Sequence, residues 1–168
     1  MFNVEDYVVC GNKGVCKVDH IGTLDMSGVD KDEEYYILKP VYSTGSTVYV
    51  PVETAEQSVR PVLSHKEADS LVDEIPSISR LEIRNEKELE QEYKVCIRSN
   101  DARELVKLLK TIYTRREARF AAGRKETALD AKYFRIAGDY LFGELAISLE
   151  LPRAEVETYI CDRGWDKA

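Results

Sequence analysis

The chain has 168 residues and a formal net charge of −7, with 43% hydrophobic and 33% charged residues. This composition is typical of a soluble globular protein rather than a disordered tail, and the length suffices for one ordinary core or two small ones. The acidity disfavours indiscriminate binding to nucleic acid, and no apolar run reaches the roughly 20 residues that a membrane helix needs.

Short β-strands separated by turns are predicted for the first third of the chain. Segments rich in Val, Ile and Tyr lie at residues 4–9, 15–21, 34–39 and 46–50. Gly, Asn and Ser between these segments favour turns, and Pro40 and Pro51 end the last two. Four or five short strands at this spacing predict a small bent sheet or a Tudor/SH3-like β-barrel.

Helices are predicted from residue 64 onwards. Ser64 is followed three residues later by Glu67, a capping-box pattern that begins a helix ending at Pro76. Asp101 and Glu104 repeat this pattern before a second helix. The apolar residues of that helix recur at amphipathic spacing, and they are Leu105, Leu108, Leu109, Ile112 and Tyr113.

Two further helices are predicted, and residues 86–92 are most simply a helix face, so we expect an all-helical bundle of four or five members. One spans about residues 127–149, with a core side formed by Phe134, Ala137, Leu141, Leu145 and Leu149. The last begins near Pro152, since Pro is well tolerated at the first helical position. The predicted fold class is α+β: a small β-barrel module at residues 1–62, a helical connector at 63–78 and an all-helical bundle at 79–168.

Charge is divided unevenly between the two parts. Residues 1–78 contain 6 Lys and Arg against 14 Asp and Glu, whereas the rest of the chain contains 18 against 17. Ten bases and only four acids fall between Arg103 and Arg135. Such a run is either a solvated helix face, the usual meaning of interspersed bases, or a surface for a polyanion. Both interpretations stay open.

Patterns typical of an enzyme or a metal site are absent. The four Cys and two His residues form no Cys-x-x-Cys pair or zinc set, and there is no phosphate-binding Gly-rich loop or nucleophile motif. We therefore expect no catalytic residue, cofactor, metal or small-molecule substrate. We also expect no membrane partner and a cytoplasmic location, because the first residues lack the basic and apolar stretches of a secretory signal.

Six segments, in order along the chain, resemble the CarD/CdnL family of bacterial transcription regulators. They are FNVEDYVV at 2–9, KGV at 13–15, YYILK at 35–39, VYVPV at 48–52, RPVLS at 60–64 and FGELA at 142–146. No single segment is specific, but six in register are. The resemblance implies a Tudor-like domain that docks on the β subunit of bacterial RNA polymerase. It also implies a helical domain that holds promoter DNA at the upstream edge of the melted bubble.

The same resemblance implies particular contact residues and no enzymatic activity or cofactor. The implied polymerase contacts are Leu24, Met26 and Tyr49, with Tyr49 on a strand that pairs with the polymerase. For Leu24 and Met26, ordinary hairpin core is an equally good interpretation. Bases of the helical part are expected near promoter phosphates, and these are Arg115, Arg116, Lys132 and Arg135.

The chain departs from the family pattern at Glu5, at Cys10-Gly11, where the family usually has Tyr-Pro, and at Glu82. Glu5 stands where the family has Gly, and Glu82 stands where close relatives have a Trp that wedges against a base at the bubble edge. A carboxylate has no face on which a base can stack, and phosphate repels it. Trp165, in the C-terminal tail, is no obvious substitute. The alternative hypothesis is therefore a polymerase- or protein-binding adaptor that no longer contacts DNA.

Overall fold

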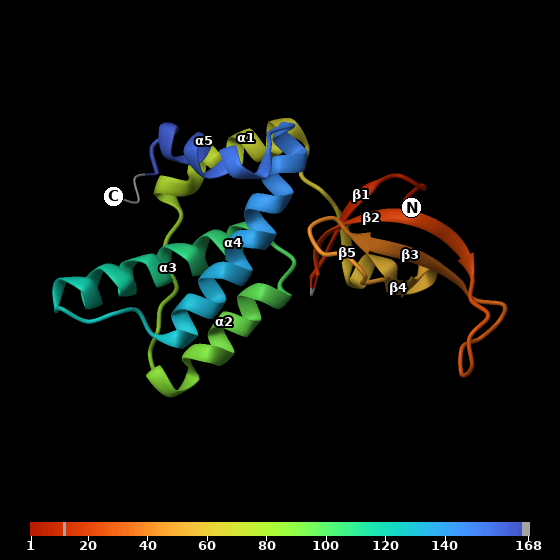
Figure 1. The fold of residues 1–168 in the computed structure, drawn as a ribbon, viewed down its shortest axis with the longest axis horizontal. Coiled ribbons are helices and arrows are strands. Elements are labelled where there is room, and N and C mark those ends of the chain that lie inside the picture. The colour runs from red at the N-terminus through yellow and green to blue at the C-terminus, as the bar shows by residue number, and fades with distance from the viewer. Residues whose placement is uncertain (12, 166–168) are drawn as a thin grey trace. The chain divides into compact units, whose positions relative to one another are not determined.

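The computed structural model describes residues 1–11 and 13–165. Contacts divide the chain into two compact units, Met1–Val62 and Leu63–Ala168. The first unit is built on a β-sheet and the second on helices (Figure 1), which confirms the predicted α+β fold class.

Five antiparallel strands are present among the described residues of the first unit. They are β1 (Tyr7–Cys10), β2 (Gly14–Thr23), β3 (Glu34–Pro40), β4 (Val48–Pro51) and β5 (Val59–Pro61). Neighbouring strands pair in the order β4-β3-β2-β1-β5, so β4 and β5 are the edges of the sheet. A 3₁₀ helix at Val52–Gln57 connects these two edge strands along the chain.

The core of this unit follows from strand alternation. Val8, Val18 and Leu38 are fully buried, and Tyr36 is nearly so. These side chains share one face because successive residues of a strand point to opposite sides of the sheet. The pairing of β2 with β3 shifts between Val18 and His20, a bulge of the kind that bends a sheet.

Strand β1 begins three residues later than predicted because Glu5 has a left-handed backbone, with φ of 77°. The bend is held by two backbone hydrogen bonds. The Glu5 amide donates to the Val18 carbonyl at 2.8 Å, and the Val18 amide donates to the Asp6 carbonyl at 2.9 Å. A left-handed conformation costs a residue with a Cβ atom roughly 1–2 kcal/mol, so this is a position that suits Gly.

Five α-helices occur in the described part of the second unit. They are α1 (His65–Glu74), α2 (Leu89–Arg98), α3 (Ala102–Ala121), α4 (Ala128–Leu149) and α5 (Val156–Asp162). Short 3₁₀ turns lie at Ile75–Ser77, Glu86–Glu88 and Arg153–Glu155. Helices α3 and α4 lie side by side, and α2 packs against both (Figure 1).

Helix starts agree closely with the predicted caps. The Ser64 side chain accepts from the Glu67 amide at 3.1 Å and the Glu67 side chain accepts from the Ser64 amide at 3.2 Å, so the capping box is confirmed. Asp101 does cap α3, but it accepts from the Arg103 amide. The expected partner Glu104 instead forms an ion pair with Lys107 at 3.0 Å.

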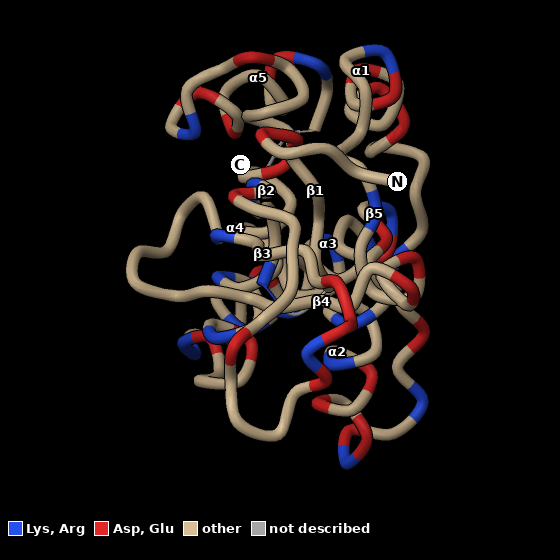
Figure 2. Tube along the Cα trace, turned by 90° about the vertical axis from the view of Figure 1, so that its right-hand side faces the viewer, with Lys and Arg blue, Asp and Glu red and all other residues tan. Residues whose placement is uncertain are grey.

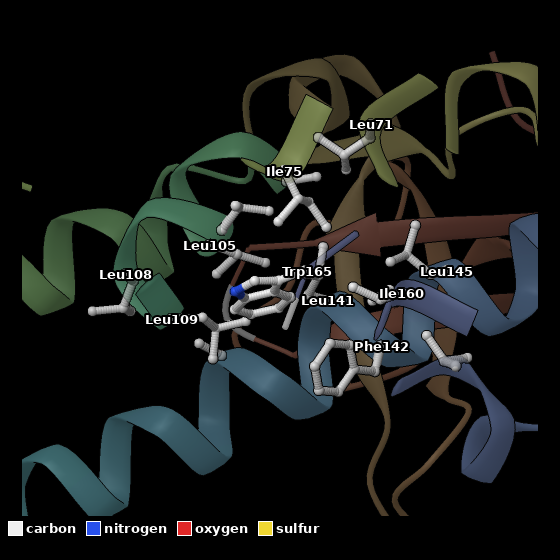
Figure 3. Close-up of a cluster of buried hydrophobic side chains, with 14 of the residues drawn as sticks. Leu71, Ile75, Leu105, Leu108, Leu109, Leu141, Phe142, Leu145, Ile160 and Trp165 are labelled. Carbon is white, nitrogen blue, oxygen red and sulfur yellow. The ribbon is translucent and has the colours of Figure 1, made fainter. Parts of the chain in front are cut away.

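Most of the predicted helical stripes are buried. On α3, only Tyr113 departs from the prediction, being half-buried; the buried residues are Leu105, Leu108, Leu109 and Ile112. On α4, Phe134 packs at the margin of the core, and the fully packed residues are Ala137, Leu141, Leu145 and Leu149. The same cluster contains Trp165, which is only 7% exposed. Figure 3 shows its indole ring among Leu105, Leu109 and Leu141.

Helix α1, predicted as a connector, packs within the second unit. Its residues Ala68, Leu71 and Val72 belong to the hydrophobic cluster that also contains the buried faces of α3 and α4. Polar contacts join it to α5. The Tyr159 hydroxyl donates to Asp69, and Arg163 forms an ion pair with Asp73 at 3.1 Å.

Candidate functional site

Tyr49 lies on an edge strand, as a residue that takes part in strand addition must. Its partner across the ladder is Ile37 of β3, and its side chain is 44% exposed. Among the described residues no strand pairs with the other side of β4. An open edge of this kind presents backbone N–H and C=O groups to a further strand. Pro51 has no amide hydrogen, so it limits the donors at the end of β4.

Leu24 and Met26 follow the end of β2, in the loop that leads to β3. Met26 is 48% exposed, whereas Leu24 is half-buried. The loop therefore exposes one of the two predicted apolar contacts and partly covers the other. Val41 and Tyr42, which follow β3, are further exposed apolar residues that sequence reasoning did not assign to the site. The available signal in the sequence was their position next to Ser43 and Gly45, in the connection between the predicted strands at residues 34–39 and 46–50.

Arg115 is bound within the helical unit. Its Nε donates to Asp130 Oδ2 at 3.0 Å and its Nη1 donates to Glu86 Oε1 at 2.8 Å. Asp130 is fully buried and also accepts from the Tyr93 hydroxyl at 2.8 Å. We call these four side chains the Asp130 network. It connects α2, α3, α4 and the turn before α2, so Arg115 neutralises a buried carboxylate that would otherwise be strongly destabilising.

Burial raises the pKa of the Tyr93 phenol, and its hydrogen bond to Asp130 raises that pKa further. The phenol therefore stays protonated and remains a donor to the carboxylate at neutral pH. This makes Tyr93 a structural residue of the Asp130 network.

Arg116 also has partners close by. Its Nε lies 2.8 Å from Glu126 Oε2, and its guanidinium lies 4.8 Å from the centre of the Phe134 ring and 6.0 Å from that of Phe120. Both aromatic distances are within the range of cation–π attraction. The Arg116 guanidinium therefore interacts with one carboxylate and two aromatic rings.

Lys132 and Arg135 are exposed on the N-terminal half of α4. The Lys132 Nζ lies 5.3 Å from the centre of the Tyr133 ring. Within the described chain, neither Lys132 nor Arg135 forms an ion pair. Of the four bases predicted to contact phosphate, these two are the ones whose charges face solvent.

Internal contacts engage most of the rest of the basic run. Arg103 pairs with Glu74, Lys107 pairs with Glu104, and Arg119 donates to the Lys125 carbonyl at 2.6 Å. Figure 2 shows the same interleaving elsewhere, with basic and acidic residues in close succession along α1, α2 and α5. The excess of bases in the sequence therefore overstates how much positive charge this unit exposes to solvent.

Lys110 is engaged in a different way. Its Nζ donates to the carbonyls of Ile75 at 2.7 Å and Ile78 at 2.6 Å. These bonds satisfy acceptors just after the C-terminal end of α1. Burial lowers the pKa of its ammonium group. Lys110 thus holds the chain after α1 against α3.

Glu82 points into solvent beside a shallow hollow. Its side chain is 84% exposed, and its carboxylate lies 3.6 Å from the Arg84 guanidinium. The Leu81 amide donates to Thr111 Oγ1 at 2.9 Å, which fixes this segment on α3. The hollow has a volume of about 460 Å³, and its lining consists of Ser79, Arg80, Leu81, Glu82, Ile83, Thr111, Thr114 and Arg115. No aromatic residue belongs to this lining, and Trp165 is committed to the core.

Comparison with known families identifies the first unit. The model of the CarD-like/TRCF RID domain matches residues 2–63. The first unit is a CarD-like/TRCF RID domain. This RID domain is a protein-interaction domain and supports an RNA polymerase-interacting, transcription-related role, consistent with a CarD-like family member. The match ends where the helical unit begins, and no curated protein matches the chain.

Membrane-spanning helices and metal-binding clusters are both missing from the described residues. None of the helices there is both long and apolar enough to cross a membrane. No group of three or more His, Cys, Asp or Glu side chains in that part of the chain is placed to hold a metal ion.

Proposed function

We propose that this protein regulates transcription initiation in the bacterial cytoplasm, without enzymatic activity, by docking on RNA polymerase and contacting promoter DNA. The RID domain binds the β subunit through β4 and the neighbouring loop, with Tyr49, Met26 and Leu24 as side-chain contacts. The observation that carries this proposal is the RID match together with the open edge of β4 and the exposed Tyr49.

The helical unit contacts the DNA backbone at the upstream edge of the bubble. Lys132 and Arg135 support this part best, because both are exposed and neither has an ion-pair partner within the described residues. Arg115 and Arg116 are proposed as neighbouring contacts that keep their internal partners. Docking on polymerase raises the local concentration of this DNA-binding surface, so a modest affinity for DNA is sufficient.

A second candidate is an adaptor that binds polymerase but no longer contacts DNA. The exposed Glu82 and the internal pairing of Arg103, Lys107, Lys110 and Arg119 favour it. The two candidates share the RID contact and differ only in whether promoter DNA strengthens the complex.

The docking proposal is tested with the full chain and purified bacterial RNA polymerase. Tyr49→Ala should weaken binding by at least about 1 kcal/mol, since exposed tyrosines at the centre of an interface are frequent hot spots. Val95→Ala removes a similarly exposed apolar side chain from α2 and should leave binding unchanged. The measurement is the dissociation constant for polymerase and for its isolated β subunit. Equal affinities of the Tyr49 variant and the original chain would contradict docking through β4.

The DNA part is tested with duplex promoter DNA over a range of salt concentrations. A double variant with Lys132→Glu and Arg135→Glu should bind all sequences more weakly, because phosphate contacts carry no base specificity. Its log–log salt slope should be shallower by about 1.8, because each phosphate that is no longer neutralised removes about 0.9. Arg115→Glu is a poor probe, because it would leave the buried Asp130 without a cation. If the original chain does not bind the duplex even at low salt, the adaptor is favoured.

A further inference from the structure

The C-terminal end of α3 and the turn into α4 expose an aromatic ring among cations. We call residues 116–126 the α3–α4 tip. Phe120 in this tip is 49% exposed. It continues the four-residue series from Ile112 and Arg116, a spacing typical of buried stripes, so its exposure is evident only in the structure.

The tip has a defined backbone. Gly123 has a left-handed φ of 75°, and the Arg124 amide donates to the Arg119 carbonyl at 2.8 Å. The Arg119 guanidinium then reaches forward to the Lys125 carbonyl at 2.6 Å. These bonds cap the C-terminal end of α3 and fix the backbone of Arg124 and Lys125. The Phe120 ring and the cations that follow it are thus presented from a fixed turn.

The charge at the tip is favourable for an anionic partner. Arg124 and Lys125 are exposed, and neither forms an ion pair within residues 1–11 and 13–165. Glu126 is paired with Arg116, which leaves Glu117 as the remaining acid of the tip. Five bases and two acids fall between residues 115 and 126.

We propose that the α3–α4 tip binds single-stranded DNA, with Phe120 stacking on an unpaired base and Arg124 and Lys125 neutralising the flanking phosphates. Every base has a face on which an aromatic ring can stack, so this contact is tolerant of sequence. The Arg116 guanidinium, 6.0 Å from the centre of the Phe120 ring and 4.8 Å from that of Phe134, adds a cation next to the stacking ring. The inference rests on the proposed DNA contact of the helical unit and assigns it a strand preference and a stacking residue.

The experiment measures binding of the full chain to a fluorescein-labelled oligothymidylate at several salt concentrations. Phe120→Ala should weaken binding about 5- to 150-fold with no change in the salt slope, since stacking involves no counterion release. A double variant with Arg124→Ala and Lys125→Ala should make the slope shallower by about 1.4, from about 0.7 per phosphate on a single strand.

Matched variants separate stacking on a base from a merely apolar contact. Phe120→Leu keeps an apolar side chain but no ring, so it should bind almost as weakly as Phe120→Ala. Val95→Ala and Lys66→Ala remove an exposed apolar side chain and an exposed cation elsewhere in the same unit, and both should bind like the original chain. Retained affinity in Phe120→Leu would show an apolar protein-type contact and overturn the stacking proposal. So would an original chain that does not bind the oligonucleotide even at low salt.

The outcome for the tip is distinguishable from that for the proposed function. Phe120→Ala should leave polymerase binding and duplex binding unchanged, whereas the Lys132 and Arg135 reversals affect the duplex. If the reversals weaken duplex binding and Phe120→Ala has no effect on the single strand, the tip proposal is wrong and the proposed function stands. If Phe120→Ala alone weakens binding, the tip is supported, and the duplex contact of α4 is wrong.

Discussion

Single residues in this chain show how position decides what a side chain does. Glu5, an ordinary surface residue by type, lies in a left-handed turn that suits Gly. Its carboxylate pairs with Lys17 at 2.5 Å, but both partners are well exposed, and such pairs contribute little to stability. Backbone conformation therefore has a greater effect on stability at this position than the ion pair.

We predict that Glu5→Gly stabilises the RID domain. Relief of the left-handed strain, roughly 1–2 kcal/mol, should exceed the lost surface ion pair and the extra freedom of the unfolded chain, for a net gain of about 0.5 kcal/mol. Urea denaturation provides the measurement. Glu5→Ala is the control, since it removes the same ion pair but keeps a Cβ atom at φ of 77°. If both variants are equally destabilised, backbone strain is not the controlling factor.

At the scale of elements, polar contacts fix how the helices of the second unit pack. Asp130 receives hydrogen bonds from α2 through Tyr93 and from α3 through Arg115. Lys110 joins α3 to the segment after α1, and Arg163 joins α5 to α1. The contacts of Asp130 and Lys110 satisfy buried or partly buried groups that would be costly to leave unbonded, whereas the Arg163–Asp73 pair lies at the surface. Many cations of this unit are consequently structural.

The raised pKa of Tyr93 predicts a loss of stability in alkali. Because the phenol binds its proton more tightly in the folded than in the unfolded state, its stabilising effect is full below the ordinary pKa of 10.0 and declines as pH rises above it. Tyr93→Phe should lower the free energy of unfolding at pH 8 by about 1 kcal/mol, through loss of the bond to Asp130. It should also weaken the further decline between pH 10 and 11.

Urea denaturation at pH 8, 10 and 11 checks this prediction. Tyr133→Phe serves as the comparison, because the pKa of its phenol is also raised but its partner Glu90 lies at the surface. An undiminished alkaline decline in the Tyr93 variant would show that other groups dominate it.

At the scale of the whole molecule, the two units have separate hydrophobic cores. One contains Val8, Val18 and Leu38 of the sheet, and the other runs from Ala68 of α1 to Trp165. Among the residues that the structure describes, no buried residue belongs to both clusters. A change in one core should therefore leave the binding surface of the other unit in place.

We predict that Trp165→Ala destabilises the helical unit by about 3 kcal/mol, because it removes a large buried ring from the core. Polymerase binding by the RID domain should be retained. Circular dichroism at the helical band follows unfolding, and a pull-down with polymerase follows binding. Cys161→Ser, an exposed change on α5, should alter neither. Loss of polymerase binding in the Trp165 variant would show that the units do not act independently.

Sequence reasoning located the elements because their signals are local. The β-rich segment at residues 15–21, the capping box at Ser64 and most of the apolar stripe of α3 depend only on nearby residues, and each lies in the element predicted for it. The later start of β1 could not be read in this way, since it follows from hydrogen bonds between Glu5 or Asp6 and Val18.

The sequence by itself thus determined the α+β class, the positions of α1, α3, α4 and α5 and the excess of bases between Arg103 and Arg135. Only the tertiary structure decided which of those bases face solvent, because ion pairs such as Arg103–Glu74 and Arg115–Asp130 join residues far apart in the chain. The structure also shows that Trp165 lies in the core and that Phe120 is exposed. Burial depends on which elements pack together in three dimensions. Ile112 and Phe120 both belong to the four-residue series of α3, yet Ile112 is packed in the core and Phe120 is exposed at the α3–α4 tip.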